Sequence, residues 1–301
     1  MPTRAPLRGA CRPSGSQHLR CVPHPGPHRR HRGTPGNPPA RDGPPMNVVF
    51  LMDPLEMVHP AKDTTLMLMV GAKRRGHAVF FLPDGGLSLH EGALGFETVE
   101  VTPALTQSPP FEIGPRRRLA QEEVGAVFIR SDPPFDERYL MNTWLLDRLP
   151  ASVPVINAPA GIRTVNEKIW ATRFPDLIPR TLITRDLETI RAFVDGEAEA
   201  VLKPTDGFGG QGIVRVKPRD PHLPQMLEEA THRGTKEVIV QPFIPEATQG
   251  DKRILLLDGD VLGAVLRVHS ETDFRNNLMV GGRAEPTTIT AEDQRIIDVL
   301  T

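Results

Sequence analysis

Residues 200–217, AVLKPTDGFGGQGIVRVK, decide which folds are open to this chain. Apolar and β-branched residues flank a loop with four glycines between positions 207 and 212, which predicts a strand, a glycine loop and a second strand. Glycines let the backbone approach a ligand and turn its N–H groups toward an anion, and Lys203 stands at the loop entrance. The stretch therefore predicts a hairpin that binds phosphate groups. The competing interpretation is a flexible turn without a ligand.

The residues around this loop exclude three better-known glycine loops. Gly207, Gly209 and Gly212 fit the G-x-G-x-x-G pattern of dinucleotide folds, but that pattern should open a helix, and residues 213–216 (IVRV) are typical of a strand. A Walker loop would end in Gly-Lys-Ser/Thr, a triplet that the sequence lacks. Protein kinases place their lysine after the loop and carry HRD and DFG motifs, whereas Lys203 precedes this loop and both motifs are absent.

Length and charge limit the class of protein. The 301 residues suffice for two domains with their own cores, and no apolar run approaches the ~18 residues of a membrane span. The net charge of −1 is uneven, because residues 1–45 hold eight arginines against one acid, a net of +7, which leaves −8 for the remainder. An acidic remainder disfavours nucleic acid as a partner. Both cysteines, Cys11 and Cys21, lie in the first segment, so the remainder suits a reducing cytoplasm.

Residues 1–45 differ from the rest in composition. With eleven prolines and few large aliphatic side chains, they cannot bury enough apolar surface to offset the entropy of ordering. The segment lacks the apolar core of a secretory signal, and its prolines exclude the amphipathic helix of a transit peptide. We interpret it as a disordered, non-native extension and predict that the native chain begins at Met46. A basic arm that binds nucleic acid is the alternative.

Residues 46–165 are predicted to form an α/β domain with a parallel sheet. An apolar run at 47–52, a Leu-, Met- and Ala-rich helix at 64–75 and a second apolar run at 77–82 predict a strand–helix–strand unit. Two further strands are expected at 126–130 and 153–157, with a helix at 136–149 between them. Residues 88–123 show poor periodicity, and we interpret their one charge run, Arg116–Arg118, as a solvated loop.

Residues 166–301 are predicted to form a second domain of antiparallel sheets with helices. A helix is expected to open at 166–168, and the other elements flank the glycine hairpin: helices at 187–193 and 222–233, a strand at 238–241, a linker at 242–245, and strands at 254–257 and 261–268. A last helix, capped by Thr290 with Asp293 three residues later, should bury Ile296, Ile297 and Leu300. Because that helix stops at Thr301 without a cap, we interpret the chain as truncated.

Several short motifs recur in the order known from one superfamily. On these motifs the chain resembles the ATP-grasp ligases and, more closely, bacterial-type glutathione synthase, over residues 46–301. The motifs are FLMDP at 50–54, KDT at 62–64, RRGH at 74–77, RSDPPFD at 130–136, NEK at 166–168, LKP with its glycine loop at 202–212, GDKR at 250–253, RNN at 275–277 and GGR at 281–283. The resemblance implies a Rossmann-like parallel-sheet domain followed by an incomplete ATP-grasp domain.

The resemblance also implies a reaction and its small-molecule partners. ATP would phosphorylate the cysteinyl carboxylate of γ-glutamylcysteine, and the amine of glycine would attack the acyl phosphate to give glutathione, ADP and phosphate. ATP is then a co-substrate and Mg²⁺, with Mn²⁺ as a substitute, the expected metal. No nucleic acid or membrane is implied, and a homo-oligomer is allowed. The family's metal ligands, an Asp on a late strand and a Glu-x-Asn pair, would follow Thr301, so we expect no metal ligand within the chain and an inactive, poorly stable fragment.

Site residues follow from the resemblance and, for some, from charge. The family pattern implies that Lys168 and Lys203 contact the phosphates, that the glycine loop closes over them, and that backbone groups hold adenine. The nucleotide-binding set is Lys168, Lys203, Gly207, Phe208, Gly209, Gly210, Gln241, Ile244 and Asp251. Arginine forks suit the two carboxylates of γ-glutamylcysteine, which favours Arg253 and Arg283 as catalytic groups. The substrate-binding set is Arg267, Arg275, Asn277, Asp53 and Asp132.

Other interpretations remain open. Each arginine alone could be a solvated or ion-paired residue, and Asp53 and Asp132 could stabilise turns before Pro54 and Pro133 instead of orienting an amine. The same fold would serve a D-alanine–D-alanine or RimK-like carboxylate–amine ligase. A non-catalytic nucleotide-binding protein is the alternative of a different class.

Overall fold

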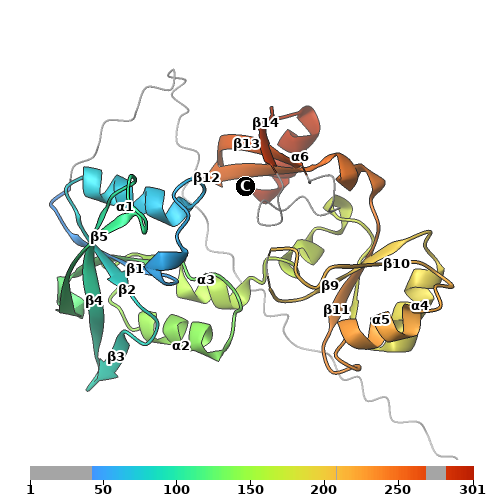
Figure 1. Cartoon of the computed structure of the whole chain (residues 1–301), viewed down its shortest axis with the longest axis horizontal. Helices are drawn as coiled ribbons and strands as arrows, with labels where there is room; N and C mark the ends of the chain where they lie inside the picture. Colours follow the sequence, from blue (N-terminus) through green and yellow to red (C-terminus); the bar gives the residue numbers. More distant parts are fainter. Residues whose placement is uncertain (1–42, 208, 269–282) are drawn as a thin grey trace, which may run out of the picture. The chain divides into compact units, whose positions relative to one another are not determined.

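The computed structural model describes residues 43–207, 209–268 and 283–301, which form three sheets with flanking helices (Figure 1). The first sheet has seven strands in the order β3-β4-β2-β1-β6-β7, with β5 paired to β4. Strands β1, β2, β6 and β7 are parallel, and β3, β4 and β5 are antiparallel. Their bounds are Asn47–Leu51 (β1), Ala78–Leu82 (β2), Leu87–His90 (β3), Ala93–Pro103 (β4), Phe111–Ala120 (β5), Val124–Ile129 (β6) and Val155–Ile156 (β7).

Strand β1 is buried on both faces because a helix covers each. Val48 and Phe50 pack with Leu66 of α1 (Thr64–Arg74), whereas Val49 and Leu51 pack in a second cluster that includes Leu146 of α2 (Glu137–Leu146). Each helix starts at an aspartate, Asp63 or Asp136, whose carboxylate accepts a backbone N–H bond from the first turn. The predicted strand–helix–strand unit is confirmed. Helix α2 ends three residues before the predicted boundary.

Residues 88–123, whose poor periodicity predicts no element, lie largely in β3, β4 and β5. Strand β5 is an edge strand whose middle is exposed, and only Phe111 and Leu119 within it are buried, so no apolar alternation marks it in the sequence. The charge run lies in this strand and not in a loop. Arg117 lies over the ring of Phe80, and Arg118 pairs with Glu97. A short 3-10 helix, Gln121–Glu123, leads from β5 into β6.

The second sheet has four strands in the order β10-β9-β11-β8, all antiparallel to their neighbours. They are β8 (Leu182–Thr184), β9 (Ala200–Pro204), β10 (Val214–Val216) and β11 (Val238–Pro242). The predicted glycine hairpin is confirmed, with Val214 opposite Leu202. Helices α4 (Leu187–Asp195) and α5 (Leu223–Ala230) contribute to one core cluster with Ala200 and Leu202. Helix α5 is shorter than predicted.

No helix opens at residues 166–168, contrary to the prediction. After α3 (Pro159–Thr164) the chain turns, and helical structure resumes only as 3-10 helices at Trp170–Arg173 and Pro175–Leu177. The side chain of Asn166 is the physical cause, because its Oδ1 accepts the backbone N–H groups of Lys168 and Ile169. Asparagine favours such local side-chain bonds over a helical backbone.

The third sheet is β12 (Asp251–Leu257), β13 (Asp260–Val268) and β14 (Arg283–Pro286), all antiparallel. The predicted turn between β12 and β13 is confirmed, with positive φ at both Asp258 and Gly259 as a type I′ hairpin requires. The 3-10 helix Pro245–Gln249 precedes this sheet. Helix α6 (Ala291–Leu300) starts at the predicted capping box. It buries Ile297, whereas Leu300 is 50% exposed, so that part of the prediction is wrong.

The predicted class, a parallel-sheet α/β part followed by antiparallel sheets with helices, agrees with these three sheets. The division at residues 165 and 166 stays a prediction. No helix in the described ranges is long and apolar enough to cross a membrane.

Candidate functional site

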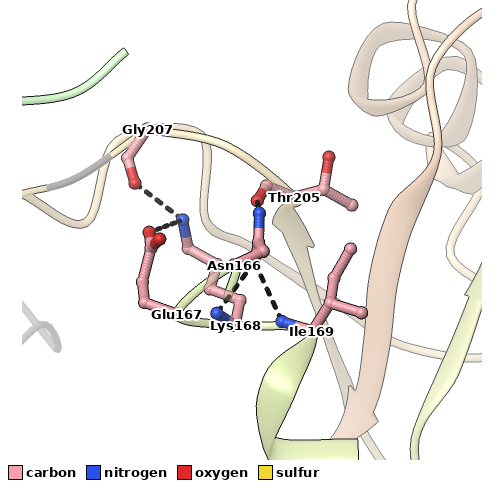
Figure 2. A network of polar contacts seen from close by, with 6 residues as sticks. All are labelled: Asn166, Glu167, Lys168, Ile169, Thr205 and Gly207. Atoms are coloured by element: carbon pink, nitrogen blue, oxygen red, sulfur yellow. Dashed lines mark hydrogen bonds and ion pairs between the residues drawn. The ribbon is translucent and has the colours of Figure 1, made fainter. Parts of the chain in front are cut away.

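Lys168 and the glycine loop are joined by a small polar network (Figure 2). The Nζ of Lys168 donates to the carbonyl of Gly207 at 2.6 Å and lies 3.3 Å from Oε1 of Glu167. The Nδ2 of Asn166 donates to the carbonyl of Thr205 at 3.0 Å, which attaches the turn to the chain just after β9. An ammonium group is therefore held at the entrance of the loop.

Lys203 supplies a second ammonium on the face of the sheet opposite α4 and α5. Alternation along β9 turns Ala200 and Leu202 toward the helices and Lys203 away from them. Its Nζ donates to Oε1 of Gln241 at 2.7 Å, and Nε2 of Gln241 donates to Oγ1 of Thr181 at 2.8 Å. Burial, and then the charge of Lys168, lower the pKa of Lys203. An anion placed between the two lysines would favour the charged form of Lys203 and so oppose this shift.

The loop that follows Lys203 needs glycine for its backbone. Gly207 has φ +84° and Gly212 has φ +69°, a region that costs other residues conformational energy. A Cβ at Gly212 would also lie 3.3 Å from Pro204. Gly209 and Gly210 share the left-handed conformation, and Phe208 lies outside the described residues. The loop thus has the backbone freedom that a phosphate cradle requires.

The linker after β11 presents one open backbone donor. The N–H of Phe243 donates to the carbonyl of Glu199 at 2.9 Å, and Pro242 has no N–H. The N–H of Ile244 meets no acceptor in the described part of the chain, and its side chain is 45% exposed. Gln241 lies in the ladder opposite Val201 and uses its side chain for Lys203. That role was missed by sequence reasoning, although strand alternation alone puts both side chains on one face.

The third sheet carries the remaining predicted residues of the second half. Asp251 and Arg267 are brought together as a two-point ion pair, with Nε of Arg267 donating to Oδ1 at 2.7 Å and Nη2 contacting Oδ2. Strand register puts Arg253 and Arg267 on one face and Arg283, which pairs with Glu285 at 2.6 Å, on the other. The two predicted catalytic arginines therefore do not share a face. Arg275 and Asn277 lie outside the described residues.

Asp53 and Asp132 meet at a cavity where β1 and β6 end. The cavity has a volume of about 390 Å³, and the backbone N–H of Asp132 donates to Oδ2 of Asp53 at 2.8 Å. Asp53 thus bridges two strand ends instead of stabilising only its own turn. Burial, and then the charge of Asp53, raise the pKa of Asp132. The carboxyl ends of parallel strands are the usual place for ligands in α/β sheets.

Four polar residues that sequence reasoning missed also line this cavity: Asp84, Arg138, Tyr139 and Asn142. Arg138 pairs with Asp84 at 2.9 Å and with Asp136 at 3.3 Å, so one guanidinium is shared by two carboxylates and leaves a net negative charge. Asp53 and Asp132 add to this negative charge, which the nearby Arg130 offsets in part at Asp132. Asp53, Asp84 and Asp132 each follow the end of a strand, and this shared position was the sequence signal that could have predicted Asp84 as a lining residue.

The described residues offer no metal site. They contain no group of three or more His, Cys, Asp or Glu side chains able to hold an ion. No chemical step is therefore assigned to the divalent cation that the resemblance implies.

Comparisons with known proteins agree on one family. A family model described as the prokaryotic glutathione synthetase N-terminal domain matches residues 46–163, and the model of its ATP-grasp domain matches residues 167–301. Glutathione synthetase of Synechocystis sp. is 38% identical over 265 residues, covering 85% of this chain and 83% of the relative. That of Synechococcus elongatus is 40% identical over 261 residues, covering 83% and 81%.

Solved structures support the fold alone. D-cycloserine synthetase DcsG matches with a TM-score of 0.55 at 16% identity, over 84% of this chain and 78% of that one. D-alanyl-alanine synthetase A from Vibrio cholerae matches with a TM-score of 0.52 at 13% identity, over 85% and 83%. With both domain models matched in order and relatives near 40% identity, the chain belongs to the prokaryotic glutathione synthetase family of ATP-grasp ligases.

Proposed function

We propose that the chain ligates γ-glutamylcysteine and glycine to glutathione in an ATP-dependent reaction. A carboxylate oxygen of γ-glutamylcysteine attacks the γ-phosphorus and ADP leaves. The amine nitrogen of glycine then attacks the acyl carbon, phosphate leaves, and the nitrogen loses a proton. The family membership supports this reaction over the other ATP-grasp ligations.

The observation that carries the proposal is the pair Lys168 and Lys203 beside the glycine loop. Phosphoryl transfer depends on neutralising charge that spreads over the phosphate oxygens, and two ammonium groups at one loop supply this. Lys203 is half-buried, has a lowered pKa, and has an amide, not a carboxylate, as its partner. We assign Lys168 and Lys203 to the phosphates and the Ile244 N–H to the adenine base.

The acidic cavity supports a second assignment. An ammonium group suits a cavity lined by four aspartates and one arginine, so we assign the cavity to the amino group of an amino-acid substrate, beside Asp53 and Asp132. Of the predicted arginines, Arg253 is assigned to a substrate carboxylate, because Arg267 is already paired with Asp251. Mg²⁺ or Mn²⁺ as the cation, a cytoplasmic location and a homo-oligomeric state stay predictions.

The test is ADP release by the chain with ATP, Mg²⁺ and γ-glutamylcysteine, with and without glycine. The family membership favours an active ligase, so we expect release that depends on glycine, together with glutathione identified by mass. That result would overturn the expectation from the sequence that the chain is inactive. D-alanine replaces glycine in a parallel assay and should give no turnover. Equal turnover with D-alanine would contradict the choice of amine. ATP binding without any turnover would favour the non-catalytic alternative.

A further inference from the structure

Arg215 connects three strands of the second sheet through its side chain. Its Nε donates to Oε1 of Glu199 at 2.9 Å and its Nη2 to Oε2 at 2.7 Å, a two-point fork. Its Cζ also lies 3.8 Å from the centroid of the Phe243 ring. Arg215 belongs to β10, Glu199 precedes β9 and Phe243 follows β11. One side chain therefore links the ends of three neighbouring strands.

The position of Phe243 makes this link relevant to the nucleotide. Phe243 immediately precedes Ile244, whose N–H is the open donor of the linker, and its own N–H is bonded to the carbonyl of Glu199. Glu199 thus holds Phe243 through the backbone and Arg215 through the carboxylate. The fork lowers the pKa of Glu199, which keeps the pair charged. The linker is fixed from both its backbone and its aromatic side chain.

We infer that Arg215 is a positioning residue for the adenine base of ATP. Arg215 stacks on Phe243 and is hydrogen-bonded to Glu199, and it thereby fixes the linker so that the Ile244 N–H points to the base. Strand β10 directly follows the glycine loop, so Arg215 also connects the part of the site that would hold the base to the part that would hold the phosphates. The inference rests on the proposed function, since it assumes that a nucleotide binds to this sheet.

The chain contains a matched control of the same residue types. Arg180 bonds Glu197, and its Cζ lies 4.3 Å from the ring of Phe193 on α4. Removing Arg180 deletes an arginine–glutamate–phenylalanine contact of the same kind without touching the linker. Arg215→Ala, Arg215→Lys and Glu199→Gln are compared with Arg180→Ala. Lysine keeps the charge but not the fork.

The experiment is calorimetric titration of each variant with ATP and with inorganic tripolyphosphate, which has no base, followed by steady-state kinetics. We expect Arg215→Ala to raise the Kd of ATP about tenfold, the effect of misplacing one hydrogen bond to the base. Arg215→Lys and Glu199→Gln should show smaller increases. The Kd of tripolyphosphate should not change in any variant. The KM for ATP should rise while kcat changes less than about twofold.

Each outcome decides the inference. An equal loss of ATP and tripolyphosphate affinity would mean that the domain is damaged and would overturn it. An effect of Arg180→Ala as large as that of Arg215→Ala, or unchanged ATP affinity in Arg215→Lys and Glu199→Gln alike, would overturn it too. If the unmutated chain bound neither ligand, the proposed function itself would fail. ATP binding by the unmutated chain with no effect of the Arg215 variants would reject the inference alone.

Discussion

A half-buried ammonium group without a carboxylate partner weakens folding, and Lys203 is such a group. Its Nζ bonds the amide oxygen of Gln241, and in the described ranges it meets no carboxylate. Burial and Lys168 lower its pKa because both disfavour the charged form. Such a cost is typical of residues kept for function, since binding of an anion repays it.

Replacing Lys203 should therefore separate affinity from stability. We expect Lys203→Met to weaken ATP binding roughly 10- to 100-fold, the value of a charge-assisted hydrogen bond, and to raise the melting temperature of the ligand-free protein. Titration calorimetry and thermal unfolding measure the two effects. Lys236→Met, at an exposed lysine, is the control. A fall in both quantities would show that Lys203 is structural.

The lowered pKa of Lys203 also sets the sign of a pH effect. Only the charged form attracts phosphate, so ATP affinity should fall as pH rises through a pKa below the ordinary 10.5. In Lys203→Arg the guanidinium stays charged, and this alkaline loss should disappear. A loss with the same midpoint in both proteins would assign it to another group.

Asp132 makes the corresponding prediction for the acidic cavity. Its raised pKa means that it loses its charge, and with it the attraction for an ammonium group, at a higher pH than an ordinary aspartate does. Asp132→Asn should raise the KM of one amino-acid substrate about tenfold and leave the KM of ATP unchanged. Asp84→Asn is the matched control, because Asp84 lines the same cavity but is paired with Arg138. Equal effects of the two variants would refute the assignment.

At the scale of elements, sequence patterns predicted the strands and helices that are specified by burial or by capping and turn residues. Strand β1 is buried on both faces and α1 lies between an aspartate cap and a glycine with positive φ, so both were found. Strand β5 was missed because the side chains in its middle are exposed on both faces. Its sequence therefore lacks the apolar alternation that marks a half-buried strand. The turn at Asn166 was missed because two side-chain hydrogen bonds outweigh a helical start.

Helix α6 is attached to β12 by an ion pair that should depend on pH. The Nζ of Lys252 donates to Oδ2 of Asp293 at 2.5 Å, and the same oxygen accepts the Thr290 N–H. Lys252 first, and then the Thr290 N–H, lower the pKa of Asp293 to about 2. A lowered acid pKa stabilises the fold above the unfolded value near 3.8, and the stabilisation is lost as pH falls toward about 2.

Asp293→Asn should therefore lower the free energy of unfolding at neutral pH by about 1 kcal/mol, the order of a helix cap. The difference from the unmutated protein should be lost as pH falls through about 2, where Asp293 itself becomes protonated. Denaturant unfolding of both proteins across this range measures it. Asp298→Asn, on the same helix and bonded only to Gln294 among the described residues, is the control. A difference that persists at low pH would contradict the ion-pair account.

At the scale of the molecule, motifs predicted which residues matter better than how they meet. The pairing of Lys168 with the Gly207 carbonyl links positions 39 apart, and the opposite faces of Arg253 and Arg283 follow from the register of β13. Neither is readable from spacing, because both depend on strand pairing between distant segments. The cavity around Asp132 was anticipated only as polar residues after a strand, without Arg138 or Tyr139.

The hydrophobic clusters suggest that the chain unfolds in parts. Two clusters consist entirely of residues between 46 and 162, and the third lies between 182 and 240. Separate cores allow separate transitions, and a ligand stabilises only the part that binds it. Scanning calorimetry should show two transitions, and ATP at about 100 times its Kd should stabilise only one, by about 2.7 kcal/mol. At the same ATP concentration Lys203→Met, with its 10- to 100-fold weaker binding, should reduce the shift to about 0.4–1.4 kcal/mol. A single transition whose midpoint ATP raises would mean that the cores unfold cooperatively, as one folding unit.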